Sequence, residues 1–311
     1  MNWQDRRVFV TGATGLVGQW LTRELLRRGA SPVLLVRDGV PTMFDFTDTC
    51  NIIRGDVCDQ ALMERILNEY DVEIIFHLAA MAIVKYGNEL PREAYKTNVM
   101  GTVSLLEAAR NVKPNARIAV ASSDKAYGAS DSLPYHEDTP LKGRNPYDCS
   151  KSCQDLIAQS YQLTQGLHVA ISRCGNIYGG GDLNWNRLIP NTIRRIVRGD
   201  TPVVYGSGYE TRDLFYVKDC VNAYLSLIEK NAEGAYNFST GEELTVRSVI
   251  ETICRLMDKP VHYSTLNELG GQIPNQVLDS SKARQELGWA PLYSLEDGLR
   301  ETIAWYEDYL R

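Results

Sequence analysis

A tyrosine and a lysine four residues apart have the types and spacing that proton transfer requires. In Tyr147-Asp148-Cys149-Ser150-Lys151 the phenol and the ammonium share one face of a helix, because side chains four residues apart lie one above the other. A fixed cation beside a phenol lowers the phenol's pKa, which lets Tyr147 take a proton from an alcohol. The same pattern also arises by chance on a helix surface, so it needs support from a cofactor site.

A glycine-rich turn near the N-terminus provides that candidate cofactor site. Residues 11–18 read Thr-Gly-Ala-Thr-Gly-Leu-Val-Gly, after a strand-like run and before a helical pattern. Gly12 permits a tight turn, Gly15 lets backbone amides approach a pyrophosphate, and Gly18 permits close packing of helix on strand. A glycine-rich turn without a ligand is the alternative. The residues expected to bind a dinucleotide here are Gly12, Thr14, Gly15, Leu16, Val17 and Gly18.

The end of the second expected strand bears on which dinucleotide is bound. An acidic residue there accepts a hydrogen bond from the ribose 2′-hydroxyl of NAD, whereas an arginine pairs with the 2′-phosphate of NADP. Arg37 stands at that place and Asp38 follows it. Arg37 favours NADP slightly, and both cofactors stay open. Asp56 and Val57 are placed to meet the adenine edge.

These residues need a scaffold, and the first 180 residues predict one. Short apolar runs alternate with helical stretches such as Leu16 to Arg28 and Ala94 to Arg110. Strands that alternate with helices indicate a doubly wound α/β fold with a parallel sheet. We expect residues 1–180 to form the dinucleotide-binding domain, with later segments able to return to it. Residues 181–311 are expected to form mainly a smaller substrate-binding region, which ends in a helix capped by Ser294. The apolar runs are 8–10, 33–36, 74–76, 118–120 and 169–171.

Composition excludes several other classes of protein. The net charge is −6, so no strongly basic domain is available for nucleic acid. No apolar run is long enough to span a membrane, and the N-terminus has no signal-peptide pattern. Seven scattered cysteines favour reduced thiols and a cytoplasmic location. Cys149 and Cys153 have no further Cys or His cluster to complete a metal site, so we expect no metal.

Taken together, the motifs resemble the extended short-chain dehydrogenase/reductase family, also called the NAD-dependent epimerase/dehydratase family. The resemblance covers almost the whole chain. Its members act on nucleotide sugars, with a Rossmann domain and a smaller C-terminal region that holds the sugar nucleotide. The segments that carry the resemblance are 11–18, Asp56, 77–80, 98–102, Tyr147 with Lys151, 212–219, 279–283 and 287–289.

The resemblance implies roles for individual residues. Tyr147, Lys151 and Ser123 would form the catalytic triad, in which Lys151 also holds the nicotinamide ribose. Further cofactor contacts would come from Leu78, Ala79, Ala80 and Asn98. Members of the family usually dimerise through the helix that bears Tyr147 and the helix around 94–110, so a homodimer is expected.

The two residues after Ser123 bear on the reaction. Family 4-epimerases usually carry small uncharged residues there, whereas 4,6-dehydratases need an acid and a base to remove water. Asp124-Lys125 resembles the pair of CDP-glucose 4,6-dehydratases, in which Asp124 would protonate the leaving hydroxyl and Lys125 would take the C5 proton. A closed pocket that holds little water would favour the neutral lysine that a base requires. A solvated ion pair at a loop edge is the alternative.

The expected substrate is a nucleotide-diphosphate sugar, with CDP-glucose favoured. The segments 173–182 and 186–190 resemble the CDP-glucose branch, and Asn176, Arg187 and Arg212 would contact the diphosphate. By contrast, residues 208–213 look more like epimerases, which leaves the base open. The expected activity is therefore a nucleotide-sugar 4,6-dehydratase. A 4-epimerase for a UDP-sugar is the first alternative, followed by a 4-keto-sugar reductase and a non-catalytic member of the superfamily.

Overall fold

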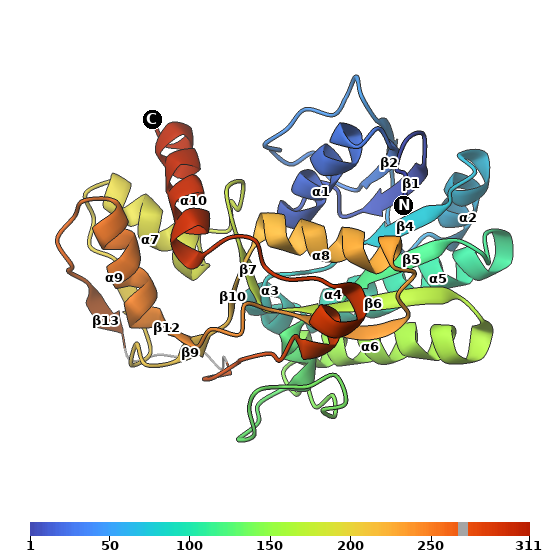
Figure 1. Ribbon diagram of the computed structural model, residues 1–311. Coiled ribbons are helices and arrows are strands. Elements are labelled where there is room, and N and C mark those ends of the chain that lie inside the picture. Colours follow the sequence, from blue (N-terminus) through green and yellow to red (C-terminus); the bar gives the residue numbers. More distant parts are fainter. Residues whose placement is uncertain (267–272) are drawn as a thin grey trace.

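Seven parallel strands form the central sheet of the computed structural model, which describes residues 1–266 and 273–311 (Figure 1). The strand order β11-β6-β5-β4-β1-β2-β3 confirms the doubly wound α/β fold. All five expected apolar runs lie in strands of this sheet. The strands are β1 (Arg7–Thr11), β2 (Ser31–Val36), β3 (Asn51–Arg54), β4 (Ile74–His77), β5 (Arg117–Ala121), β6 (His168–Cys174) and β11 (Gly234–Phe238).

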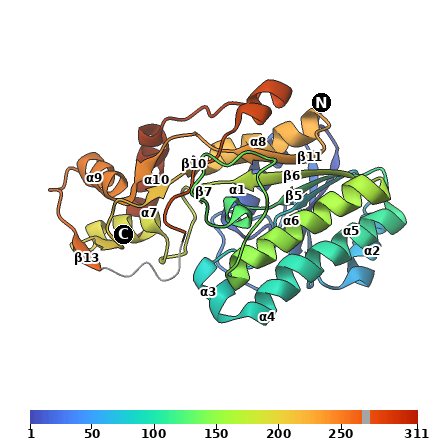
Figure 2. The same cartoon turned by 90° about the horizontal axis from the view of Figure 1, so that it is seen from below.

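Helices cover both faces of the sheet. On one face lie α1 (Leu16–Arg27) and α8 (Val217–Glu229), which contact each other. On the other face α2 (Gln60–Glu69), α5 (Gly101–Val112) and α6 (Pro146–Gln165) lie side by side (Figure 2). Because apolar side chains point to both faces of each strand, two hydrophobic cores form, one beneath each helical layer.

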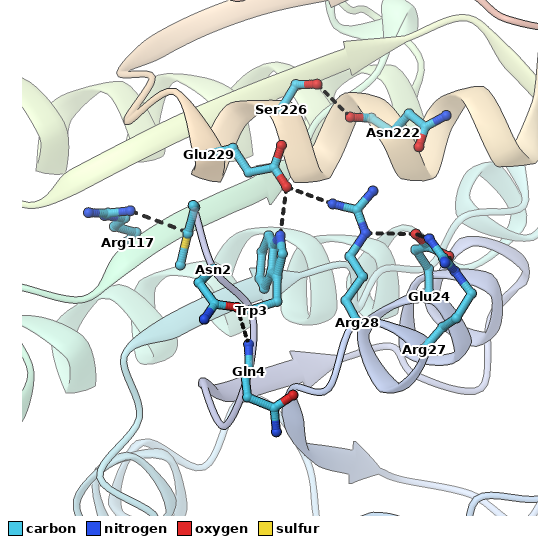
Figure 3. A network of polar contacts seen from close by, with 11 residues as sticks. Asn2, Trp3, Gln4, Glu24, Arg27, Arg28, Arg117, Asn222, Ser226 and Glu229 are labelled. Carbon is cyan, nitrogen blue, oxygen red and sulfur yellow. Dashed lines mark hydrogen bonds and ion pairs between the residues drawn. The ribbon is translucent and has the colours of Figure 1, made fainter.

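A polar network fastens the N-terminal segment and α1 to α8 (Figure 3). The carboxylate of Glu229, at the end of α8, accepts hydrogen bonds from Trp3 Nε1 and from Arg28 Nη1, each at 2.6 Å. Arg28 Nε also donates to Glu24 in α1 at 2.7 Å. The ring of Trp3 meanwhile packs in the core beside Phe76 of β4. These contacts place α1, and with it the glycine turn, against the sheet.

The helix expected at 94–110 is interrupted, which corrects the sequence prediction. The short helices α3 (Val84–Glu89) and α4 (Pro91–Ala94) are followed by a π-helical turn, η1 (Tyr95–Met100), before α5 begins. Asn98 in this turn has no exposed surface and bonds to Met81 and Ser150, in two other segments. A wider π turn therefore accommodates an inward-facing polar residue that a regular helix would place elsewhere.

The remaining elements form a second region with its own core. Its helices α7 (Leu188–Val197), α9 (Val246–Leu256) and α10 (Leu295–Tyr309) pack together. The expected cap of the last helix is confirmed, since Ser294 Oγ accepts a hydrogen bond from Asp297 N at 3.2 Å. However, β11 is a strand of the seven-stranded sheet and α8 packs against that sheet. Residues after 180 are therefore divided between the two regions. Three two-stranded ladders complete the second region. They are β7 (Asn176–Tyr178) with β10 (Leu214–Tyr216), β8 (Val203–Tyr205) with β13 (Ser264–Leu266), and β9 (Thr211–Arg212) with β12 (Leu244–Thr245).

A fully buried ion pair joins α6 to β6. Arg173 Nε and Nη2 each lie 2.8 Å from a carboxylate oxygen of Asp155, and both side chains are at most 2% exposed. Ser122 Oγ also donates to Asp155 at 2.5 Å, and Arg173 donates to Tyr127 Oη at 2.8 Å. The network fixes α6 at the level of the strand ends that carry the site.

Asp155→Asn should destabilise the fold strongly. Removing one charge of a buried pair leaves the other uncompensated, at a cost of about 3–5 kcal/mol in the free energy of unfolding. Urea denaturation followed by circular dichroism measures this change. The control is Glu107→Gln, which removes the carboxylate from a surface pair with Arg110 and should leave the midpoint near that of the wild type. Equal midpoints for the two variants would contradict a structural role for the buried pair.

Candidate active site

The turn between β1 and α1 is packed too closely to accept side chains. Gly12 has a φ of +70°, and a Cβ atom there would lie 2.6 Å from the carbonyl carbon of Leu78. A Cβ atom on Gly18 would lie 2.2 Å from Gly12 O. Gly15 caps α1 without a side-chain hydrogen bond, so backbone N–H groups at the helix N-terminus are available to an anion. The turn therefore fits the pyrophosphate of a dinucleotide.

A cavity of about 970 Å³ opens at this turn and extends to the second region. It lies where β1 and β4 run side by side with their crossovers going to opposite sides, the usual binding place in such sheets. The structure brings all but one of the predicted site residues to its wall. They are Gly12, Thr14, Gly15, Leu16, Val17, Gly18, Arg37, Asp56, Val57, Leu78, Ala79, Ala80, Ser123, Asp124, Lys125, Tyr147, Lys151, Asn176, Arg187 and Arg212.

Asn98 is the exception, because it does not line the cavity. Its Oδ1 accepts a hydrogen bond from Met81 N at 2.8 Å, and its Nδ2 donates to Ser150 Oγ at 2.8 Å. Asn98 therefore ties the segment after β4 to α6 instead of reaching into the cofactor space. Its effect on the site is through the position of these two segments.

Tyr147 and Lys151 lie in the first turns of α6, and both are buried. Contrary to the sequence prediction, burial raises the pKa of Tyr147, although the charge of Arg187 and a hydrogen bond with Ser123 lower it in part. The Lys151 ammonium donates to Ala121 O at 3.0 Å and to Gln154 Oε1 at 2.8 Å. Burial also lowers the pKa of Lys151 to about 8. Desolvation thus favours the uncharged form of both side chains, the phenol of Tyr147 and the amine of Lys151.

Asp124 and Lys125 form an ion pair in the cavity wall, at the start of the short 3₁₀ helix η2 (Asp124–Tyr127). Lys125 Nζ lies 3.1 Å from Oδ1 and 3.0 Å from Oδ2 of Asp124. The Lys125 side chain is 14% exposed and the Asp124 side chain is 2% exposed, so this is not the solvated surface pair of the alternative interpretation. Ser123 Oγ donates to Asp124 Oδ1 at 2.9 Å, which joins the pair to the predicted triad.

Two residues of the wall that were not predicted from the sequence have a buried polar atom without a partner among the described residues. Asp148 is 3% exposed, its Oδ1 has no hydrogen-bond partner among the described residues, and burial raises its pKa to about 6. Gln276 is 1% exposed, and its Nε2 has no partner within residues 1–266 and 273–311. Asp148 lies inside the Tyr147–Lys151 motif, which could have drawn attention to it. Gln276 carries no local signal.

The residues expected at the adenosine ribose and at the adenine edge form polar contacts within the protein. Arg37 Nε lies 2.7 Å from Asp38 Oδ2, and both side chains are more than half exposed. Asp56 accepts a hydrogen bond from Cys58 N at 3.0 Å, and this bond contributes most to lowering the Asp56 pKa. Asp38 and Asp56 also line the cavity, so their carboxylates can accept hydrogen bonds from a ligand there.

The residues expected at the diphosphate lie on the second region's side. Arg187 pairs with Asp182 at 2.9 Å, and Arg212 donates to Pro274 O at 2.6 Å. The Asn176 side chain lies 3.5 Å from Lys125 Nζ, through Oδ1. The Nδ2 of Asn176 is without a partner among the residues that the structure describes. Asn176, Arg187 and Arg212 thus bring two guanidinium groups and an amide to the wall of the cavity.

Within residues 1–266 and 273–311 no three Cys, His, Asp or Glu side chains gather as a metal site would require. Over the same residues no helix combines the length and apolarity needed to cross a bilayer.

Comparison with known proteins places this geometry in a family. The model of the GDP-mannose 4,6 dehydratase family matches residues 9–302. CDP-glucose 4,6-dehydratase of Salmonella typhimurium is 31% identical, over 99% of this chain and 92% of that protein.

Solved structures agree with this assignment. A dTDP-glucose 4,6-dehydratase of Streptomyces venezuelae, with NAD and TYD bound, superposes with a TM-score of 0.90 at 29% identity and covers 97% of each chain. UDP-glucose 4-epimerase of Thermotoga maritima, with UDP-glucose, gives a TM-score of 0.93 at 25% identity, over 98% of this chain and all of that one. The resemblance predicted from the motifs is confirmed, and the chain belongs to the GDP-mannose 4,6 dehydratase family of extended short-chain dehydrogenases/reductases.

Proposed function

We propose that this protein is a nucleotide-sugar 4,6-dehydratase. The single observation that carries the proposal is the buried Asp124–Lys125 pair, which lies in the cavity wall and is hydrogen-bonded to Ser123. Oxidation and reduction at C4 alone need a tyrosine base. Loss of water across C5 and C6 also needs a group that takes a proton and a group that gives one.

Each side chain has a role that follows from its place. Tyr147 in its phenolate form, which the Lys151 ammonium favours against the effect of burial, removes the proton of the sugar O4, while Ser123 orients that hydroxyl. Lys125 takes the C5 proton, which the neighbouring 4-keto group makes acidic, and Asp124 protonates the departing O6. Lys125 later returns a proton to C5. A nicotinamide cofactor, when bound, would supply the capacity to accept a hydride from C4 and return it to C6.

The sugar loses the O4 proton and a hydroxide, which together amount to one water, while the hydride and the C5 proton are restored. The O4 proton left on Tyr147 replaces the proton that Asp124 gave to O6, which returns the enzyme to its starting charge. The 3.0 Å contact between Lys125 and Asp124 also gives the pair a direct route to its working state. Transfer of one proton along it converts the ion pair into a neutral amine and a carboxylic acid without exchange with solvent. A site that holds little water favours the neutral form.

CDP-glucose is the substrate that we favour, and Asn176, Arg187 and Arg212 are proposed to bind its diphosphate. The similarity to CDP-glucose 4,6-dehydratase over 99% of the chain supports this choice. A UDP-sugar 4-epimerase is the second candidate, because an epimerase has the same fold at a TM-score of 0.93. It would use Tyr147, Lys151 and Ser123 but assign no chemistry to Asp124 and Lys125.

We propose NAD as the cofactor, held by the glycine turn and by Asp56, Val57, Leu78, Ala79 and Ala80. The sequence slightly favours NADP through Arg37. However, Asp38 lies 2.7 Å from Arg37 and competes with a 2′-phosphate for its charge, while offering an acceptor to a 2′-hydroxyl. The related dehydratase structure that contains NAD supports the same choice.

We also propose that two copies associate through α6 and the segment 94–110. Apolar side chains on this face are exposed, and a second copy would cover them. They include Leu156 at 53% and Leu163 at 73%, seven residues apart on α6, and Met100 at 51% in η1.

All seven cysteines are free thiols, which supports a cytoplasmic location.

Replacing Lys125 by methionine should stop water loss while C4 oxidation continues. Methionine has a similar length but cannot take a proton. Mass spectrometry of products from CDP-glucose, dTDP-glucose and UDP-glucose, each with NAD, detects the loss of one water. Tyr147→Phe is the comparison and should abolish both steps, by a factor of about 10² or more. If Lys125→Met removes water at the wild-type rate, or if the wild type only yields a C4 isomer of unchanged mass, the dehydratase proposal fails.

The Arg37–Asp38 pair should decide between the two nicotinamide cofactors. Wild-type protein is expected to bind NAD more tightly than NADP, and Asp38→Ala should move the ratio of dissociation constants toward NADP by freeing Arg37. Isothermal titration with each dinucleotide measures both constants. Arg37→Ala serves as the control and should weaken NADP alone. Tighter binding of NADP by the wild type would instead support the preference indicated by Arg37.

Leu163→Glu should separate the two copies of the proposed dimer. A carboxylate in the centre of an apolar interface is costly to bury. Light scattering coupled to size exclusion gives the mass directly. Leu292→Glu, at an equally exposed leucine in the second region, should leave the mass unchanged. A wild-type chain that elutes as a monomer would refute the proposed association.

A further inference from the structure

The Lys151 ammonium is held by a residue that the proposed chemistry does not use. Two of its three N–H donors go to Ala121 O at 3.0 Å and to Gln154 Oε1 at 2.8 Å. Lys151 also lines the cavity, so its remaining donor is the one available to a ligand. Gln154 lies one turn further along α6 and has no exposed surface. Its carboxamide therefore lies behind the catalytic pair and does not line the cavity.

From Gln154 a chain of hydrogen bonds runs beneath the site to the glycine turn. Gln154 Nε2 donates to Thr102 Oγ1 in α5 at 3.0 Å, and Thr102 Oγ1 lies 2.8 Å from His77 Nε2 at the end of β4. His77 Nδ1 lies 2.9 Å from Thr11 Oγ1, at the end of β1. Thr11, His77, Thr102 and Gln154 are all fully buried. Four elements distant in the sequence are thus joined to Lys151.

The direction of every bond in the chain follows from one proton. Thr102 has a single hydroxyl proton and donates it to Asn98 O at 2.8 Å, so Gln154 and His77 must both donate to its oxygen. His77 therefore carries its proton on Nε2, and its Nδ1 accepts from Thr11. Burial lowers the pKa of His77 to about 3, which agrees with this neutral ring. The Gln154 amide consequently has one orientation, with oxygen toward Lys151 and nitrogen toward Thr102.

The neutrality of Gln154 matters as much as its geometry. A carboxylate of the same shape would give the buried ammonium a counter-ion at hydrogen-bond distance. With the amide, burial dominates and lowers the pKa of Lys151, opposed by the carboxylate of Asp155 on α6 and by the Cys174 sulfur on β6 whenever that thiol is ionised. His77 faces Lys151 from β4 and stays neutral. The amide thus orients the ammonium without neutralising it.

We propose that Gln154 is a positioning residue for the Tyr147/Lys151 pair: its carboxamide aims the Lys151 ammonium into the cavity and anchors it, without a counter-ion, to the buried chain that ends at the glycine turn. The proposal rests on the proposed oxidoreductive function of the site in that Lys151 must be charged while Tyr147 takes its proton. It assigns a role to a residue that touches neither substrate nor cofactor.

Two substitutions of nearly equal size should move the Lys151 pKa in opposite directions. Gln154→Glu places a carboxylate beside the ammonium and should raise this pKa by about one unit or more. Gln154→Met removes the acceptor and should lower it. The pKa is measured by NMR titration of protein labelled at the lysine Cε, with the signal assigned from its loss in Lys151→Arg. This readout needs no substrate, so it remains decisive if the proposed reaction is wrong.

Turnover of CDP-glucose with NAD, or of whichever nucleotide sugar proves active, is the second readout. The pH at which turnover falls on the alkaline side should follow the Lys151 pKa, upward for Gln154→Glu and downward for Gln154→Met. Gln162→Glu and Gln162→Met, on the exposed part of the same helix, are the matched controls and should shift neither quantity. If Gln154→Glu does not fold, Gln154→Met against Gln162→Met decides.

An unchanged Lys151 pKa in the Gln154 variants would overturn the proposal. So would a shift in the same direction for both variants, because that is what a general loosening of the packing produces. A turnover profile that fails to follow a shifted pKa would also overturn it. If no nucleotide sugar is turned over by the wild type, the proposed function fails by itself, and the NMR titration alone judges the role of Gln154.

Discussion

The close approach of two backbones at the end of β1 is the constraint on which the site depends. Gly12 meets the carbonyl of Leu78 with no room for a Cβ atom, and Gly18 meets Gly12 in the same way. Thr11, just before the turn, accepts a hydrogen bond from Ala79 N through its hydroxyl at 3.2 Å. The ends of β1 and β4 are thereby held together, and the cavity opens at the edge that they share. Side chains larger than hydrogen would separate the two segments and close the space for a pyrophosphate.

One helix, α6, supplies the Tyr147/Lys151 pair, and its faces meet different surroundings. Tyr147 and Lys151 face the cavity, while Asp155 is paired with Arg173 in the interior. Gln154 lies between these environments and connects Lys151 to Thr102. The buried polar groups are costly to desolvate, so most of them have a partner, and these partners come from β5, β6, α5 and η1. The position of α6 is consequently specified by polar contacts as well as by apolar packing.

Burial also sets the electrostatics of the reaction centre. It raises the pKa of Tyr147 and lowers the pKa of Lys151, so the phenol ionises less readily and the ammonium loses its proton more readily than in water. The same environment brings Asp124 and Lys125 into direct contact at 3.0 Å, where one proton can move between them. In the proposed reaction this contact would let the acid and the base exchange a proton directly, without a bridging water.

The fold and the composition of the site could largely be predicted from residues close together in the sequence. Alternating apolar runs and helical patterns defined the sheet, because buried parallel strands and amphipathic helices have local periods. The turn from Gly12 to Gly18, the Tyr147–Lys151 spacing and the Asp124-Lys125 pair were likewise visible, since each lies within a few residues.

Only the tertiary structure decided properties that arise between distant segments. The π turn at 95–100 follows from the contacts of Asn98 with Met81 and Ser150, and no local pattern encodes these partners. The direction of the Tyr147 pKa shift, the orphaned oxygen of Asp148 and the chain from Gln154 to Thr11 all depend on burial. Burial is produced by elements that are far apart in the sequence but packed together. The sequence by itself therefore determined which groups are present. Their protonation depends on the water that folding removes around them, and their orientation depends on the partners that folding brings into contact with them.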